Sequence, residues 1–352
     1  MERPRIKAFP TMKKLILSFF VFYIPLHLLG QNGLQGGRYF LLLKDEKTVS
    51  VNTFDTEIKE IKTYPINKNS LFTTDQKQRI AILDTANNIL IYNIETETVV
   101  KLPIPFKIEP KTILLNDDNL FVGGEAEKDI LIQYHLKTNK WHQLKIPKEV
   151  KRKRAIDDLV VNDSLLIAID NVVFPKYILF FRLNSTEKLA FSHLQKVKSN
   201  GAYEEIHQGR ITNNYLGLIS YAYGDMGYAE NIAIYNNMEL TKCFSISAET
   251  KRDGRNGYPI LNFNDFLLIG NKLFIANKEK GLGLFEIKNS YFRVRNYNAA
   301  VRVSEEKVNY KAYEDEEIIK LTKIPNNETK IILTIRDKNG KIRQEVVEIY
   351  NN

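Results

Sequence analysis

The stretch ILLNDDNLFVGGEAEKDILIQYHLKTNKWHQLKIP, from Ile113 to Pro147, contains the pattern that decides the fold. Apolar and polar side chains alternate along its short runs, and alternation with a period of two is typical of β-strands that bury one face. Polar turns such as Asn116–Asn119 separate these runs, and turns of this kind join antiparallel strands. The stretch therefore predicts three or four short strands in an up-and-down meander.

Related meanders recur along nearly the whole chain. Residues 158–194 read as the strands DLVV, SLLIAID, YILFFRL and KLAFSHL, and residues 266–297 as FLLI, KLFIAN, LGLFEI and YFRVRNY. A large side chain in the third strand marks the register, at Tyr92, Tyr134, Phe181, Tyr235 and Phe285, and the column extends outward to Asn52 and Ile335. Its members lie 40 to 54 residues apart, and repeats of this length with four strands each are typical of the blades of a β-propeller.

The seven marker positions predict an all-β fold, a single β-propeller domain of seven four-stranded blades over residues 38–350. Six or eight blades also fit, because residues 296–317 match the pattern poorly. The first block has three obvious strands, and the chain ends in the strand KIRQEVVEIY with no block after it. We therefore expect the N-terminal and C-terminal strands to pair in one blade, which would close the ring and hide its sheet edges.

The blade pattern resembles the broad superfamily of kelch, WD40 and YVTN-type propeller repeats. The third block is most similar to a kelch repeat, because Gly123-Gly124 follows an apolar strand and Tyr134 and Trp141 lie seven residues apart. The other blocks lack the double glycine and the tryptophan, and no block ends in Trp-Asp. The resemblance covers residues 38–350 in architecture and one block in motif, and it implies a platform for binding rather than one activity.

Residues 1–30 have the pattern of a secretory signal peptide. Lys13 and Lys14 precede an apolar segment from Leu15 to Leu29, and the small residue Gly30 stands where cleavage would occur. A start of translation at Met12 would also fit this pattern. The apolar segment has 15 residues, whereas a membrane-spanning helix needs about 20, so we expect cleavage rather than an uncleaved anchor, and no span in the mature chain. No cysteine lies near the cleavage point, so we expect a periplasmic or secreted bacterial protein that is not a lipoprotein.

Charge and cysteine content exclude few classes of function. The net charge is +9, and residues 1–30 contribute five basic side chains and one acidic one, so the mature surface is mildly basic. The densest basic run, Lys148–Arg154, reads as an exposed loop between blades. It contains none of the aromatic residues that a nucleic-acid platform would interleave with the charges, so we expect no specific nucleic-acid partner. Cys243 is the single cysteine, which excludes an internal disulfide.

The chain shows no motif for catalysis, metal binding or a cofactor. It has no HExxH, P-loop, dinucleotide glycine fingerprint or GxSxG sequence, and we predict no catalytic residue, metal or cofactor from it. Paired carboxylates remain an alternative, because glycoside hydrolysis uses two of them about 5–10 Å apart. The candidates near block starts are Asp157, Asp158, Glu204, Glu205, Glu305 and Glu306, which otherwise read as solvated loop acids.

Two loops are the predicted binding site. Residues 221–228 read YAYGDMGY, which joins amphipathic contact surface to backbone freedom, as recognition loops do. Residues 251–258, KRDGRNGY, follow in the next connection between blades. On one face they would form an aromatic and cationic patch for a carbohydrate, a peptide or another protein. The alternative is that the tyrosines pack between blades and the glycines turn the chain. The predicted binding residues are Tyr221, Tyr223, Asp225, Tyr228, Arg252, Asp253, Arg255 and Tyr258.

These observations favour an exported β-propeller that binds a ligand or acts as a scaffold, with specificity in its inter-blade loops. One alternative is a propeller enzyme that acts on glycans or peptides with carboxylates at the mouth of the channel. Another is a structural component of an envelope assembly, held through the sides of the blades.

Overall fold

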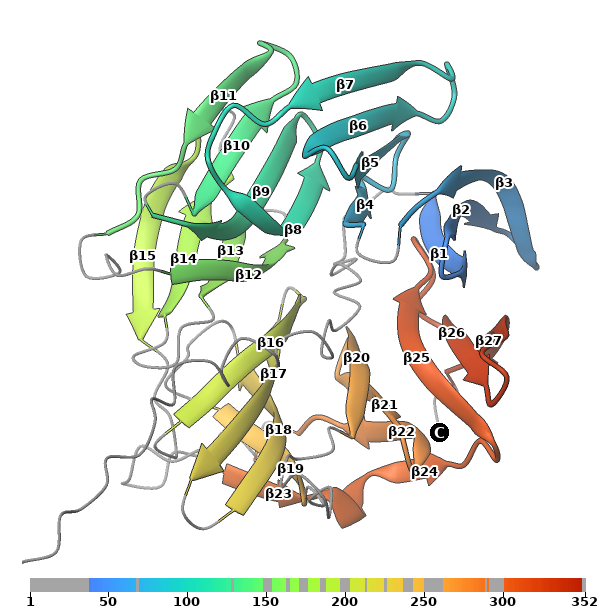
Figure 1. The fold of residues 1–352 in the computed structure, drawn as a ribbon. Coiled ribbons are helices and arrows are strands. Elements are labelled where there is room, and N and C mark those ends of the chain that lie inside the picture. Colours follow the sequence, from blue (N-terminus) through green and yellow to red (C-terminus); the bar gives the residue numbers. More distant parts are fainter. Residues whose placement is uncertain are drawn as a thin grey trace, which may run out of the picture.

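The computed structural model describes residues 38–349, apart from 68–69, 128–129, 148–153, 163–164, 171–176, 184–187, 197–202, 213, 225–226, 237–242, 250–261, 289 and 291–300. Within this part the chain forms successive antiparallel meanders of three or four strands. Figure 1 shows them arranged around a common centre, with the first strand of each meander innermost.

The first three meanders are β1–β3 (Phe40–Asp45, Thr48–Phe54, Ile58–Pro65), β4–β7 (Phe72–Thr74, Arg79–Leu83, Asn88–Asn93, Val99–Pro103) and β8–β11 (Glu109–Asn116, Asn119–Ala126, Leu131–His135, Lys140–Gln143). The next two are β12–β15 (Arg154–Val161, Leu165–Asp170, Tyr177–Arg182, Ala190–Lys196) and β16–β19 (Tyr203–Ile211, Tyr215–Gly224, Gly227–Asn236, Cys243–Glu249). The last two are β20–β22 with β24 (Phe263–Ile269, Lys272–Asn277, Gly281–Glu286, Asn309–Lys311) and β25–β27 (Glu316–Lys323, Lys330–Asp337, Ile342–Glu348). Strand β23 (Val301–Ser304) and the 3-10 helix η3 (Glu305–Lys307) lie between β22 and β24 in the chain.

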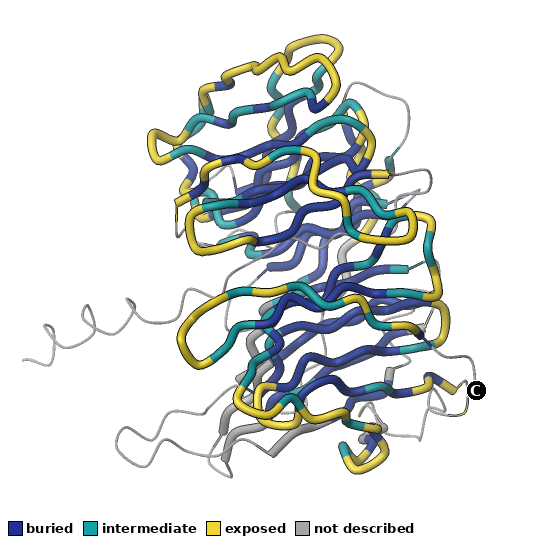
Figure 2. The backbone as a smooth tube through the Cα atoms, turned by 90° about the vertical axis from the view of Figure 1, so that its right-hand side faces the viewer, coloured by how far each residue is buried: buried dark blue, intermediate teal, exposed yellow. Residues whose placement is uncertain are grey.

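Apolar side chains fill the spaces between neighbouring meanders. One cluster joins β4–β7 to β8–β11 through residues such as Ile89 and Leu120, and another joins β16–β19 to β20–β22 through Ile234 and Phe266. Figure 2 shows the result along the backbone, where the middles of the strands are buried and the turns are exposed. Each sheet buries both faces against its neighbours, as the blades of a propeller do.

A β-bulge recurs at a matching position of the inner strand in five meanders. The register shifts between Pro110 and Thr112, and at the matching positions of β12, β16, β20 and β25. The residues that follow the bulges are Thr112, Asp158, Gln208, Asp265 and Lys320. A bulge bends its strand and re-aims a side chain, so this position carries the polar residues that are described below as part of the site.

The all-β propeller class and the meanders at residues 113–147 and 158–194 are confirmed. The marker residues from Tyr92 to Phe285 all lie in third strands, but Asn52 and Ile335 lie in β2 and β26, the second strands of their meanders. The column was therefore wrong at both ends. The count of seven four-stranded blades stays a prediction, because β1–β3 and β25–β27 have three described strands each.

The expected pairing of the two ends of the chain is not found among the described residues. Strands β1–β3 and β25–β27 form two separate sheets. They meet instead through a cluster of Phe40 and Leu42 with Ile324 and Ile332, and the side-chain amide of Gln344 donates a hydrogen bond of 2.9 Å to the carbonyl of Leu43. Packing thus joins the first and last described sheets, as the adjoining blue and red strands in Figure 1 illustrate.

The predicted fourth strand after β22, YFRVRNY at residues 291–297, lies outside the described residues. The fourth strand of that sheet is β24, where Leu282 of β22 pairs with Lys311. Before β24, strand β23 adds in parallel to β19, the outer strand of the preceding meander. Residues 301–311 therefore tie two neighbouring sheets together, which explains why residues 296–317 fit the repeat pattern poorly.

Candidate functional site

The tyrosine-rich segment is part of a β-hairpin and not a loop. Tyr223 of β17 pairs with Tyr228 of β18, and Gly224 pairs with Gly227 at the tip. Alternation of tyrosine with alanine suits an extended strand, because aromatic residues favour β-structure. The two glycines, which are typical of loops, led to the prediction of a loop. Of the other predicted binding residues, Asp225, Arg252, Asp253, Arg255 and Tyr258 lie outside the described residues.

The topology brings the tyrosine hairpin and the described residues that flank 250–261 to one face of the molecule. The end of β17, the start of β18 and the end of β19 lie at the same end of their sheet, because each strand runs antiparallel to the one before it. The start of β20 lies beside them. A direct contact joins these flanks. One carboxylate oxygen of Glu230, in β18, accepts hydrogen bonds from the backbone N–H groups of Asn262 at 2.6 Å and Phe263 at 3.0 Å.

Glu230 is an unusual acid within this face. Its side chain is 1% exposed, and its second oxygen has no hydrogen-bond partner among the described residues. Burial raises the pKa of Glu230 to about 7, and the charge of Glu305 adds to the effect. Glu305 itself accepts hydrogen bonds from Lys280 Nζ at 2.7 Å, Tyr310 Oη at 2.9 Å and Asn277 Nδ2 at 3.1 Å. Burial and Glu305 raise the pKa of Tyr310 in turn.

Buried charges link the inner strands of successive sheets. Asp158 accepts hydrogen bonds from the backbone N–H groups of Leu159 at 2.9 Å and Gly209 at 2.7 Å, so it connects β12 to β16. Asp265 does the same between β20 and β25, because its second oxygen accepts from the N–H of Leu321 at 2.8 Å. Burial raises the pKa of Asp158 to about 6. These carboxylates therefore have a structural use, since their oxygens are already engaged.

Asp265 also forms a buried ion pair with Arg210, at 2.7 Å between Nη2 and Oδ1. Lys320, from the neighbouring inner strand, is 4% exposed, and burial lowers its pKa to about 8. Sequence reasoning missed Arg210, Asp265 and Lys320. The signal that could have found them is a charged residue near the start of an apolar run, at the same place in successive repeats. An acidic residue in an exposed turn gives the same sequence pattern, so the signal is ambiguous.

The remaining predicted carboxylates lie on β12, on β16 and in η3. Asp157 lies half-buried in β12, and Glu204 and Glu205 lie in β16, where the side chains of these two residues are outside the described part. Glu306 is exposed in η3, beside the Glu305 described above. The described residues contain no group of three or more His, Cys, Asp or Glu side chains that could hold a metal ion.

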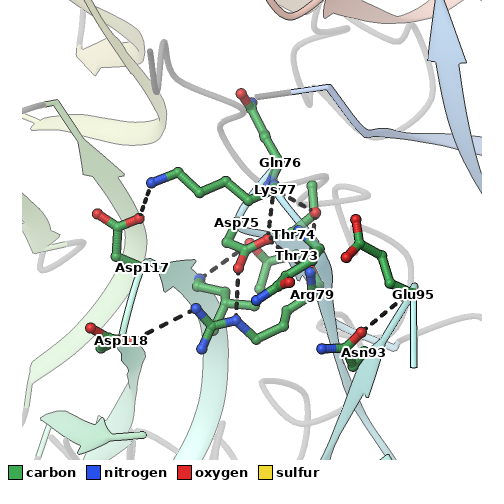
Figure 3. A network of polar contacts seen from close by, with 12 residues as sticks. Thr73, Thr74, Asp75, Gln76, Lys77, Arg79, Asn93, Glu95, Asp117 and Asp118 are labelled. Carbon is green, nitrogen blue, oxygen red and sulfur yellow. Dashed lines mark hydrogen bonds and ion pairs between the residues drawn. The ribbon is translucent and has the colours of Figure 1, made fainter. Parts of the chain in front are cut away.

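A pocket of about 240 Å³ lies between the sheet β4–β7 and the meander β8–β11, which belongs to an eight-stranded sheet because β9 also pairs with β12. Its walls include Arg79, Ile91, Asn93, Val100, Tyr134 and Asn139. Arg79 belongs to the polar network of Figure 3, in which Asp75 accepts from the backbone N–H groups of Lys77, Gln78 and Arg79 and pairs with the Arg79 guanidinium at 2.8 Å. The predicted turn at Asn116–Asn119 is confirmed and joins this network, because Lys77 pairs with Asp117 at 2.5 Å.

Comparison with known proteins identifies the fold. No family model matches the chain, and no curated protein matches it in sequence. The solved structures it resembles include Saccharomyces cerevisiae Sqt1, with a TM-score of 0.51, 11% identity and coverage of 89% of this chain and 81% of that one. Another is the β-propeller domain of Myceliophteria thermophila Cps50 (Swd1), with a TM-score of 0.54, 12% identity and coverage of 89% and 94%.

The fold is a β-propeller. At 11% and 12% identity this likeness concerns the fold alone. It agrees with the resemblance drawn from the repeat pattern, and it specifies no ligand. Within the part of the chain that the structure describes, no helix has the length and hydropathy needed to cross a membrane.

Proposed function

We propose that this chain is an exported β-propeller of the bacterial envelope or exterior, which binds a protein, peptide or carbohydrate through the connections on one face. The propeller fold supports a binding or scaffold role, because rigid blades hold exposed loops whose sequences are free to vary. The signal-peptide pattern at residues 1–30 supports export. That segment lies outside the described residues.

One observation supports the choice of face. The hydrogen bonds from Asn262 and Phe263 to Glu230 hold the start of β20 against the start of β18. Tyr221, Tyr223 and Tyr228 and the residues that flank 250–261 therefore belong to the same end of the molecule. Aromatic residues beside arginines suit a polar or anionic ligand with flat surfaces, such as a sugar ring or a peptide.

A propeller enzyme with paired carboxylates is the weaker candidate. The oxygens of Asp158 and Asp265 are engaged by backbone N–H groups or by Arg210. The free oxygen of Glu230 is shielded from solvent, so a substrate would not reach it without rearrangement. Binding thus needs fewer assumptions than catalysis. A structural role in an envelope assembly rests on the same fold and has no observation of its own.

The test is a glycan and peptide array probed with the mature protein from Gln31 onward. We expect one ligand class to bind, and the double variant Tyr223→Ala, Tyr228→Ala to weaken that binding by about tenfold or more, since each lost aromatic contact contributes about 1 kcal/mol or more. Phe191→Ala is the matched control, because Phe191 is an exposed aromatic residue on the outer strand β15. Unchanged binding by the tyrosine variant would contradict the proposal.

Export is tested separately by expression of the full chain from Met1 in a Gram-negative host. We expect the protein in the periplasm or medium, with a new N-terminus near Gln31 in Edman or mass-spectrometric sequencing. An intact N-terminus on protein retained in the cytoplasm would contradict the targeting assignment, whatever the arrays show.

A further inference from the structure

The outer strand β7 has an unusual surface for an edge strand. Its sheet runs in the order β4-β5-β6-β7, so among the described strands nothing pairs with its outer edge. Val99 and Val100 are 55% and 53% exposed, the highest values among the exposed large apolar side chains of the described residues. The outer strands β3, β15 and β27 carry one such residue each, at 43%, 36% and 37%. A free edge of this kind is a template for another strand.

The register shows which backbone groups of β7 point outward. The N–H of Asn93 donates to the carbonyl of Thr98 at 2.9 Å, so these two residues form a hydrogen-bonded pair at the start of the ladder. Hydrogen-bonded and non-hydrogen-bonded pairs alternate in antiparallel sheets. The next pair, Val99 with Tyr92, and the pair Lys101 with Leu90 are therefore of the second kind. The N–H and C=O groups of Val99 and Lys101 thus face away from β6 and are available to a partner strand.

A pocket lies on one face of this edge. Thr98 and Val100 both line the pocket of about 240 Å³ between the two sheets, together with Ile91 and Tyr134. Successive side chains of a strand point to opposite faces, so Val99 points away from the pocket. A strand added to β7 would place alternate side chains over the pocket, beside Val100. The volume accommodates one or two aliphatic side chains.

The charges and hydrogen-bond donors around the pocket indicate the kind of occupant. Arg79 pairs with Asp75 at 2.8 Å, and Lys137 pairs with Asp118. Carboxylates already neutralise these cations, so the rim of the pocket favours an uncharged ligand. Asn93 uses its Oδ1 for the N–H groups of Glu95 and Thr96, and Asn139 accepts from the Tyr134 hydroxyl at 3.0 Å. Their side-chain N–H groups are left to donate, and peptide carbonyls are the matching acceptors.

We propose that β7 and the adjoining pocket bind an extended, uncharged peptide segment of a partner protein, which adds to the sheet as a further strand and inserts an aliphatic side chain beside Val100. Main-chain hydrogen bonds then supply affinity and the pocket selects the side chain, as in other cases of strand addition. This surface lies on the side of the propeller and is separate from the tyrosine hairpin of the proposed function.

The experiment measures fluorescence anisotropy of a fluorescein-labelled peptide, Thr-Val-Thr-Val-Thr-Val with blocked ends, against the full chain. We expect saturable binding, weakened about tenfold or more by Val100→Asp, because a buried aliphatic contact is lost. Val99→Asp is the matched control on the opposite face of the same strand, and it should stay within about twofold. Lys101→Pro should also weaken binding about tenfold, since it removes an outward N–H without breaking a β6–β7 hydrogen bond. Lys101→Ala controls for the lost charge.

A second arm leaves the protein unchanged. Methylation of alternate backbone nitrogens of the probe removes its ladder hydrogen bonds while keeping its side chains, and we expect the binding to be lost. Failure of the unmodified probe to bind at 1 mM, equal effects of Val99→Asp and Val100→Asp, or unchanged binding of the methylated probe would each overturn the proposal. The variant Tyr223→Ala, Tyr228→Ala should leave this binding intact, so the outcome is independent of the proposed function.

Discussion

At the scale of single residues, the position that follows the bulge of the inner strand carries residues of different charge in successive repeats. Asp158 and Asp265 accept backbone N–H groups of the next sheet, whereas the equivalent Lys320 presents a buried ammonium group. Desolvation raises the pKa of a buried acid and lowers that of a buried amine. Burial at this position therefore raises the pKa of Asp158 to about 6 and lowers the pKa of Lys320 to about 8.

Glu230 leads to a prediction about pH. Its pKa is raised from 4.5 in the unfolded chain to about 7 in the folded protein. An acid whose pKa is higher in the folded state stabilises that state when it is protonated. The stabilisation by protonated Glu230 is therefore complete below pH 4.5 and is lost as the pH rises through about 7. Across that window the free energy of unfolding should fall by up to about 1.4 kcal/mol per pH unit. Glu230→Gln should remove this slope, as measured by urea unfolding at each pH.

Glu97→Gln serves as the control, because it makes the same side-chain exchange at an exposed position, where Glu97 pairs with Lys62. Asp158 contributes a slope of the same sign between pH 3.8 and about 6, so the Glu230→Gln variant should keep that lower part. A profile identical to that of the unmodified protein between pH 6 and 7 would contradict the assignment.

At the scale of elements, the double glycine that resembles a kelch motif has a local physical reason. A Cβ atom on Gly124 would lie 2.1 Å from the carbonyl oxygen of Glu109 in the neighbouring strand, next to the bulge of β8. On Gly123 it would meet the side chains of Ile156 and Thr112, at 2.6 and 2.8 Å. Both glycines thus permit close packing, but only Gly124 lies against backbone.

We therefore predict that Gly124→Ala destabilises the protein by about 1–3 kcal/mol, because the β8–β9 ladder must shift to relieve the clash. Gly123→Ala should cost less, since side chains move more easily than a paired strand. Urea midpoints of the two variants compare the effects directly. A larger loss for Gly123→Ala than for Gly124→Ala would show that the side-chain contacts with Ile156 dominate.

Local patterns predicted most of the strands but not the pairings that depend on distant partners. The meanders β8–β11 and β12–β15 follow from alternation and turn residues, which act within a few positions. Strand β23 pairs in parallel with β19, whose residue Phe244 lies opposite Val301. No local signal specifies a partner so far away, since tertiary packing decides the pairing.

The candidate site was predictable in part for the same reason. The tyrosine hairpin was singled out by composition, and strand order then placed its flanks beside the start of β20. The pocket at Val100 was not foreseen, because it forms between two sheets and its walls come from separate stretches of sequence. Glu230 was overlooked, since its burial arises from the contact with residues 262 and 263.

At the scale of the whole molecule, the first and last described sheets meet without a ladder between their described strands. The sheets β1–β3 and β25–β27 pack through Phe40, Leu42, Ile324 and Ile332. A ring closed by apolar packing should unfold as one unit if this junction contributes to the stability of every sheet. An open array would instead lose its terminal repeats first, because each repeat contacts only its neighbours.

Ile332→Ala distinguishes these cases, because Ile332 is fully buried at the junction and Trp141, the single tryptophan, lies in the distant sheet β8–β11. The truncation should cost about 2–5 kcal/mol. In a cooperative ring, tryptophan fluorescence and far-ultraviolet circular dichroism should report the same lowered urea midpoint. Val346→Ala, at a 37% exposed position of β27, should change the free energy of unfolding by no more than about 0.5 kcal/mol with either signal. A tryptophan midpoint that stays unchanged in Ile332→Ala, while the dichroism transition broadens, would mean that the two ends of the chain touch without stabilising the rest of the ring.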